Sequence, residues 1–87
     1  MAISNEELIN EVKKLRDDSE RTAAQVMEAG EQIRHYGLNM ANALRGSRSG
    51  EQASRLVELT GRSLCDTSVA IKSIVPVSEN LLQEITR

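Results

Sequence analysis

The fold is decided by one short stretch in the middle of the chain, Leu44-Arg45-Gly46-Ser47-Arg48-Ser49-Gly50-Glu51-Gln52. It interrupts a helical pattern that runs almost unbroken on both sides. Gly46 suits the left-handed position just past a helix C-terminus, where a side chain would clash. Ser49 followed by Gln52 is a capping-box pattern, which predicts the start of the next helix. Because the interruption is short, we expect the two helices to pack as antiparallel neighbours.

The first predicted helix covers residues from about 5 to 44. Ser4 and Glu7 form a capping box at its start, and Ile3 with Leu8 has the spacing of a hydrophobic staple. The positions expected to pack follow in alternating steps of four and three, as in a heptad pattern. They are Leu8, Val12, Leu15, Ser19, Thr22, Val26, Ala29, Ile33, Tyr36, Met40 and Ala43.

The turn is expected over residues 45–50 and the second helix from about 50 to 85. Its packing row is predicted to be Ala53, Leu56, Thr60, Ser63, Thr67, Ala70, Ile74, Val77 and Leu81. Glu51 with Arg55 and Glu58 with Arg62 are acid-first pairs four residues apart, which favour an exposed helical face. Pro76 lacks an amide proton and its ring clashes with the carbonyl of the residue four positions earlier. We therefore expect a kink near Pro76, the alternative being a helix that stops near residue 74 and restarts.

Two further rows suggest contacts beyond these packing positions. Ala23, Gly30 and Gly37 recur every seven residues, and glycine inside a helix costs about 1 kcal/mol relative to alanine. Two interpretations stay open for this row: close packing within the hairpin, or a subunit interface on its flank. In the second helix an extra apolar row consists of Val57, Leu64, Ile71 and Ile85. Together with the packing row of that helix it makes an apolar face wider than one neighbouring helix can cover, so we assign it to a partner interface. Under the second of the two interpretations, Ala23, Gly30 and Gly37 belong to the same interface.

Composition supports an all-α fold in a single domain of 87 residues. Tyr36 is the only aromatic residue, so aliphatic side chains and alanine must do the packing. A chain this small buries a modest core, so we expect the hairpin to complete a four-helix bundle with a helical partner. The net charge of −2 includes no basic stripe of the kind that nucleic acid requires. No apolar run approaches transmembrane length, and we expect no membrane insertion.

The sequence shows little that would support catalysis. Cys65 is the only cysteine, which excludes an internal disulfide, and no cluster has the spacing of a zinc site. His35 is the only imidazole that could activate Cys65, and a two-helix hairpin builds no concave pocket. We therefore expect no enzyme activity, no cofactor and no metal. A small enzyme that depends on Cys65 or His35 is the least favoured class.

The layout resembles the WXG-type small proteins of bacterial type VII (ESX or Ess) secretion systems. Those proteins have a capped first helix, a second helix of similar length and a Trp-x-Gly motif at the hairpin tip. Here Leu44-Arg45-Gly46 stands in that place, which is similar to LXG-type substrates and the small helical partners of LXG toxins. The first residues have neither a basic region nor an apolar run, so we expect no export by the general secretory route.

The resemblance implies a secreted substrate or targeting partner that forms a homodimer or heterodimer, pairing with another helical hairpin, such as a second copy of this chain, or with the helical region of an LXG-type effector. It would be exported without a cleavable signal peptide and lie in the cytoplasm before export. The family's Tyr-x-x-x-Asp/Glu signal is missing after the second helix, so a partner would supply the signal, or it takes another form around residues 81–85. The alternative function is a cytoplasmic coiled-coil adaptor or a chaperone-like subunit of another assembly. Under the first hypothesis, Leu64→Asp or Ile71→Asp is expected to abolish partner binding.

Overall fold

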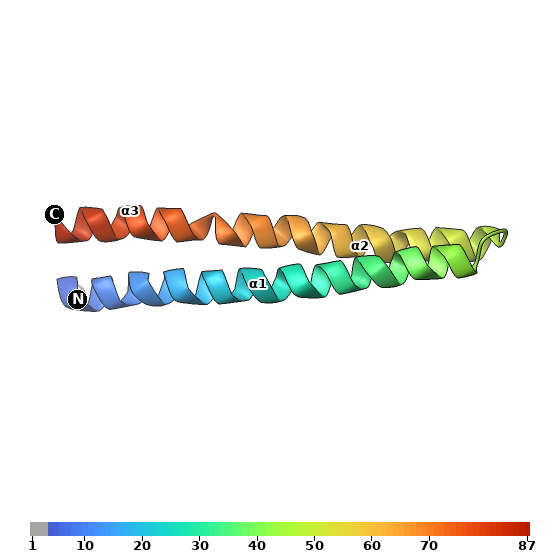
Figure 1. The fold of residues 1–87 in the computed structure, drawn as a ribbon. Coiled ribbons are helices and arrows are strands. Elements are labelled where there is room, and N and C mark those ends of the chain that lie inside the picture. The colour runs from blue at the N-terminus through green and yellow to red at the C-terminus, as the bar shows by residue number, and fades with distance from the viewer. Residues whose placement is uncertain (1–3) are drawn as a thin grey trace.

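The computed structural model describes residues 4–87, which form an antiparallel helical hairpin (Figure 1). Helix α1 spans Asn5–Ala43, α2 spans Arg48–Lys72 and α3 spans Ile74–Thr86. Helices α2 and α3 follow one another along α1, so the start of α1 and the end of α3 lie at the same end of the molecule. Its dimensions are 62 × 22 × 14 Å. The hairpin is therefore one helix thick, and both broad sides of this slab lie open.

The first helix begins as expected. The Ser4 hydroxyl accepts a hydrogen bond from the Glu7 amide at 3.1 Å, which satisfies one of the free amide groups of the first turn. The staple partner Ile3 lies outside the described residues. At the other end, the Leu44 amide donates to the Met40 carbonyl, and Gly46 has a φ of +94°. This backbone conformation strains any residue with a Cβ, so the role expected of Gly46 in the turn is confirmed.

The start of the second helix differs from the expectation. Ser47, rather than Ser49, is the N-cap, and its hydroxyl accepts from the Gly50 amide at 3.2 Å. A Glu51 carboxylate oxygen accepts from the Gly46 amide at 3.1 Å, so Glu51 closes the turn. No Glu51–Arg55 ion pair forms within residues 4–87, whereas the Glu58–Arg62 pair forms at 3.5 Å. The turn is thus shorter than predicted, because the cap lies at Ser47, two residues before Ser49, and α2 begins at Arg48.

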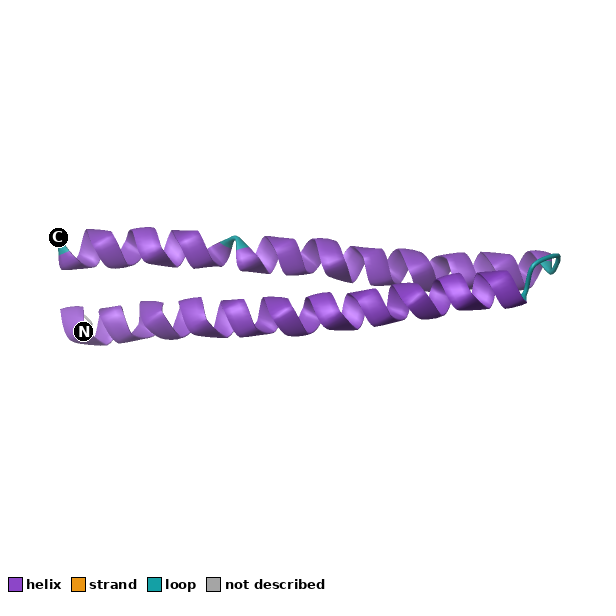
Figure 2. Ribbon diagram, in the orientation of Figure 1, coloured by secondary structure: helices purple, strands orange, loops and turns teal. Residues whose placement is uncertain are grey.

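The second arm of the hairpin is interrupted at a single residue. Helix α2 ends at Lys72, and the break falls at Ser73, three residues before Pro76 (Figure 2). The cause is the one expected from the sequence: Pro76 has no amide proton to donate to the Lys72 carbonyl. Ser73 keeps a right-handed backbone, with φ −64° and ψ −15°, so α3 resumes in nearly the same direction. The second arm is therefore two helices joined by a bend at Ser73, which agrees with the kink expected near Pro76, although one residue lies between the end of α2 and the start of α3.

The two arms meet along a seam of small side chains. On α1 its buried members are Val12, Ser19, Ala23, Gly30 and Gly37. On α2 and α3 they are Ser54, Gly61, Ser68 and Ser78. The half-buried Val57, Leu64, Ile71, Val75, Leu82 and Ile85 alternate with the second set in steps of three and four. This alternation runs through the break at Ser73 without a slip, so α3 continues the register of α2.

This seam corrects the assignment of packing rows made from the sequence. Ala23, Gly30 and Gly37 are buried between the two arms, which confirms the interpretation of close packing within the hairpin, and their assignment to a partner interface is wrong. The second interface row, Val57, Leu64, Ile71 and Ile85, is half-buried in the same seam. The reason is steric. Helices whose backbones nearly touch need glycine and serine between them, and the larger side chains are left on the outside.

Hydrogen bonds satisfy the hydroxyls that this arrangement buries. The Ser68 hydroxyl donates across the seam to the Ala23 carbonyl at 2.6 Å. The Ser54 and Ser78 hydroxyls donate within their own helices to the carbonyls four residues earlier, Gly50 and Ile74. Serine is therefore as well suited as alanine to the narrow space, because it leaves no buried polar group without a partner.

Candidate partner interface

Large apolar side chains lie on the outside of the hairpin, at positions that the sequence assigned to its core. Leu15 and Tyr36 on α1 are 43% and 61% exposed, and Leu56 on α2 is 67% exposed. On α3, Val77 and Leu81 are 54% and 42% exposed. Only Val12 and Ala23 are fully buried hydrophobic residues within the described chain. The arms are thus held together by close backbone packing, and most of the aliphatic surface is left without a cover.

These exposed residues lie on one broad side of the slab. A groove runs along one edge of the seam. It is lined by Met27, Glu31 and Arg34 of α1 and by Arg62 and Cys65 of α2. Helical periodicity places the row of Leu15 and Tyr36 on the other side of the α1 seam, and the row of Leu56 and Val77 on the other side of the α2 seam. Both rows therefore face away from the groove, in the same direction.

We call this side the apolar face. It consists of Leu8, Leu15, Thr22, Ala29, Tyr36 and Ala43 on α1, with Ala53, Leu56, Thr60, Ser63, Thr67, Ala70, Ile74, Val77 and Leu81 on α2 and α3. These rows contain no charged residue. Bulky side chains gather at its two ends, and alanine, serine and threonine occupy the middle.

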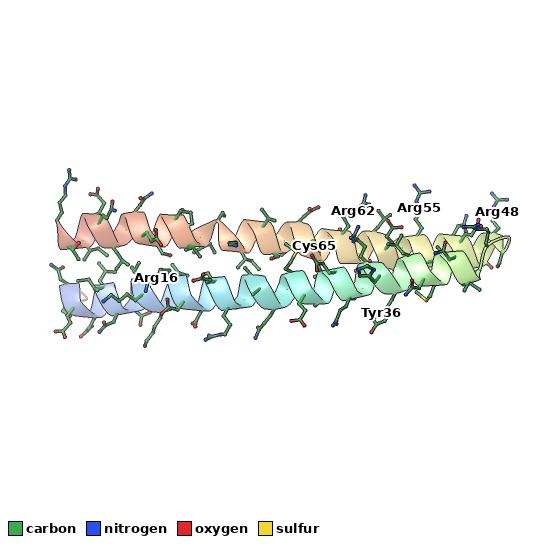
Figure 3. All side chains as sticks on the ribbon, viewed as in Figure 1. Arg16, Tyr36, Arg48, Arg55, Arg62 and Cys65 are labelled. Atoms are coloured by element: carbon green, nitrogen blue, oxygen red, sulfur yellow. The ribbon has the colours of Figure 1, made fainter. Side chains whose placement is uncertain are left out.

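The opposite side of the molecule is charged. Arg48, Arg55 and Arg62 recur every seven residues and extend from α2 away from α1 (Figure 3). Near the hairpin tip, Tyr36 extends in the other direction. The row of arginines continues into Val69, which is 62% exposed. The groove on the other broad side is lined in part by Glu31, Arg34 and Arg62, so the two broad sides differ in charge, and the apolar face is the one suited to cover by a helical partner.

The tip motif has a structural role. Leu44 closes α1, and a Cβ on Gly50 would lie 2.9 Å from the Leu44 Cβ, so the leucine packs directly on the first turn of α2. Gly46 provides the left-handed step between them. Leu44 is still 42% exposed. Both motif residues thus shape the turn, while part of the leucine side chain stays accessible at the tip.

The residues considered for catalysis are separated. Cys65 is half-buried at the groove edge of the seam, with its Sγ 4.0 Å from the Met27 carbonyl oxygen, and it packs on Gly30. His35 is exposed and has no hydrogen bond or ion pair to Cys65 in the described chain. Across residues 4–87, no group of three or more histidine, cysteine, aspartate or glutamate side chains is arranged to hold a metal ion. Within the same residues, none of the helices combines the length and apolarity needed to cross a bilayer.

Comparison of the chain with known protein families, with characterised proteins and with solved structures finds no match.

Proposed function

We propose that this chain is a non-enzymatic helical-hairpin protein of type VII secretion, a secreted substrate or targeting partner. It acts by placing its apolar face against another helical hairpin, either a separate small protein or the helical region of an LXG-type effector. Together the two hairpins form a four-helix bundle. The observation that carries the proposal is the uncharged face that runs the length of the hairpin, with large side chains exposed at both ends.

The accessible surface of the chain supports a missing partner. The hairpin exposes 6526 Å². A compact monomer of 9.6 kDa is expected to expose about 5,100 Å². The excess of roughly 1,400 Å² is larger than the ~800 Å² that each partner buries in a standard protein interface. A second hairpin on the apolar face would remove surface of this order.

The tip supports the assignment to this class of secretion protein. Leu44 and Gly46 occupy the place of the family motif, at a turn between arms of similar length. The family's tyrosine-based export signal is absent from the end of α3. In this proposal the partner supplies that signal, so the bundle rather than the single hairpin is exported.

The proposal is tested by fractionation of the native bacterium, with the protein detected in cells and in cell-free medium and its mass measured intact. We expect full-length protein in the medium without a lysis marker, and none in the medium of a strain whose type VII machine is inactivated. Leu56→Asp, which places a carboxylate on the apolar face, is expected to keep the protein inside the cell. Val69→Asp on the opposite side is the matched control and should be exported normally.

Two results would contradict the proposal. Wild-type protein confined to cells that export other substrates of the same machine would favour the cytoplasmic adaptor or chaperone-like subunit. Equal export of the Leu56→Asp and Val69→Asp variants would show that the apolar face is not needed.

A further inference from the structure

We propose that the outer edge of α2 is a docking site for an acidic helix of another protein. We call this surface the arginine edge and define it by Arg48, Arg55, Leu59 and Arg62. It is the narrow side of the slab that faces away from α1, as Figure 3 shows for the three arginines, and it shares no residue with the apolar face. The inference adds a second contact surface and is independent of the function proposed above.

The three arginines form a straight row along α2. They recur every seven residues, which is close to two helical turns, so they leave the helix in nearly the same direction, about 10 Å apart along its axis. Each of the three residues is exposed. A second helix that lies along α2 repeats its own side chains at the same interval. Carboxylates seven residues apart on such a helix would therefore meet all three guanidinium groups at once.

The turn leaves most of this positive charge without a partner. Glu51 is four residues before Arg55, but its carboxylate accepts a hydrogen bond from a backbone amide of the turn instead. Within residues 4–87, neither Arg48 nor Arg55 forms an ion pair. Arg62 pairs with a glutamate one turn earlier at 3.5 Å, and its side chain is still 58% exposed. Two guanidinium groups are thus free, and the third is accessible.

An apolar side chain lies within the row. Leu59 is four residues after Arg55 and three before Arg62, so helical periodicity places it between them on the same edge. It is 44% exposed and belongs to neither the seam nor the apolar face. A leucine flanked by two guanidinium groups gives the edge an apolar centre and a polar rim, as in other protein interfaces. The partner helix must therefore be amphipathic as well as acidic.

The arginine edge does not suit phosphate groups or a second copy of the chain. Its three cations are spread over about 21 Å, and Glu51 and Glu58 lie in the adjacent row of α2, where they would repel a nucleic acid or an anionic bilayer. Those partners are bound by denser basic clusters. In this sequence no three acidic residues recur at seven-residue spacing, so another copy cannot match the row. A helix of a different protein, with carboxylates at this interval, is the complementary partner.

The first experiment measures the binding of two synthetic helical peptides to the purified full chain by fluorescence anisotropy. Each peptide has about 22 residues, which is long enough to span the row. One has three glutamates at seven-residue spacing with a leucine between successive glutamates, and the other has the same composition in scrambled order. We expect the first peptide to bind about 10-fold more tightly or better, because only it presents all its carboxylates on one side. Its affinity should fall as the salt concentration rises.

Variants of the chain then locate the contact. Arg55→Glu should weaken binding of the first peptide by about 10-fold or more, because repulsion replaces attraction. Leu59→Ser should weaken it by about 10-fold, because the apolar centre is lost. Lys14→Glu on α1 makes the same change in net charge and is the matched control, which should bind as the wild type does. All three positions are exposed, so circular dichroism should show helix content unchanged.

Two kinds of result would overturn the inference. Equal binding of the two peptides, or equal losses in Arg55→Glu and Lys14→Glu, would show that only net charge matters. Tighter binding of single-stranded DNA or of phosphatidylglycerol vesicles than of the first peptide would assign the edge to a phosphate ligand. The proposed function would survive either result, since it depends on the apolar face. Failure of export by a chain that still binds the first peptide would contradict the proposed function alone.

The second experiment identifies the natural partner in the native bacterium. A photo-reactive amino acid replaces Leu59, and mass spectrometry locates the segment to which it cross-links. We expect an acidic helical segment of another protein with carboxylates seven residues apart, captured about 10-fold less when Arg55→Glu is also present. Cross-linking to a segment without this spacing, or equal capture in the presence of Arg55→Glu, would contradict the inference.

Discussion

Three glycines determine how close the two arms of the hairpin lie. A Cβ on Gly61 would lie 2.4 Å from the Arg34 amide nitrogen, and one on Gly37 would lie 2.5 Å from the Glu58 amide nitrogen. A Cβ on Gly30 would lie 2.8 Å from the Gly61 carbonyl oxygen. In each case the obstacle is the backbone of the other arm, which cannot move aside as a flexible side chain can. Glycine here is a packing requirement, and it excludes larger residues from the seam.

Replacement of Gly61 tests this close approach. By helix propensity alone, Gly61→Ala should stabilise the chain by about 1 kcal/mol. We expect the opposite, a decrease of about 1–3 kcal/mol in the free energy of unfolding, because the added methyl group overpacks the seam. Urea unfolding followed by circular dichroism at fixed protein concentration measures the change. Asp66→Ala, on the exposed outer side of α2, is the control and should leave stability equal or slightly higher. A Gly61→Ala variant more stable than wild type would refute the steric argument.

At the scale of single elements, local signals explain where the helices begin and end. The cap at Ser4 and the left-handed Gly46 were predictable from sequence, because each depends on only a few neighbouring residues. The cap at Ser47 was not, because Ser47 and Ser49 offer competing serine hydroxyls in the same turn. The bond from the Gly46 amide to Glu51 selects the earlier one. Pro76 likewise causes the interruption at Ser73. The position of the interruption depends on which carbonyl Pro76 leaves without an amide donor.

The two serines of the turn allow a direct comparison. Ser47→Ala removes the side-chain cap of α2 and should cost about 1 kcal/mol of stability, whereas Ser49→Ala should change it by less than about 0.5 kcal/mol. Thermal and urea unfolding of the two variants under identical conditions give the difference. A larger loss in Ser49→Ala would restore the cap predicted from the sequence.

At the scale of the whole molecule, the hairpin is a thin slab with two fully buried hydrophobic residues in its described part. Such a core contributes little hydrophobic stabilisation, so burial of the apolar face on assembly should dominate the stability. Stability that depends on association also depends on protein concentration. The unfolding temperature is therefore expected to depend on concentration, so a measurement at one concentration does not define it.

Association with a second copy would raise the unfolding midpoint of the wild type by about 4 °C for each tenfold increase in protein concentration, whereas association with a different hairpin would raise it only when that partner is added. The Leu56→Asp variant, whose apolar face is interrupted, should show a lower midpoint that does not depend on concentration. Differential scanning calorimetry over a concentration series provides the measurement. A wild-type midpoint independent of concentration would mean that the monomer is stable by itself.

The sequence alone determined that this chain is an antiparallel helical hairpin, because capping, helical periodicity and the glycine turn act over a few residues each. It left open which of two adjacent rows on each helix forms the seam. Leu15 and Tyr36 were predicted to be core, and Gly30 was left open between the seam and an outer flank, since hydrophobicity specifies burial but not against which surface. Only the tertiary structure decided this. Close backbone contact leaves room only for small residues at the points of nearest approach, with aliphatic residues such as Leu64 half-buried beside them, so Leu15, Tyr36 and Leu56 lie on the surface available to a partner.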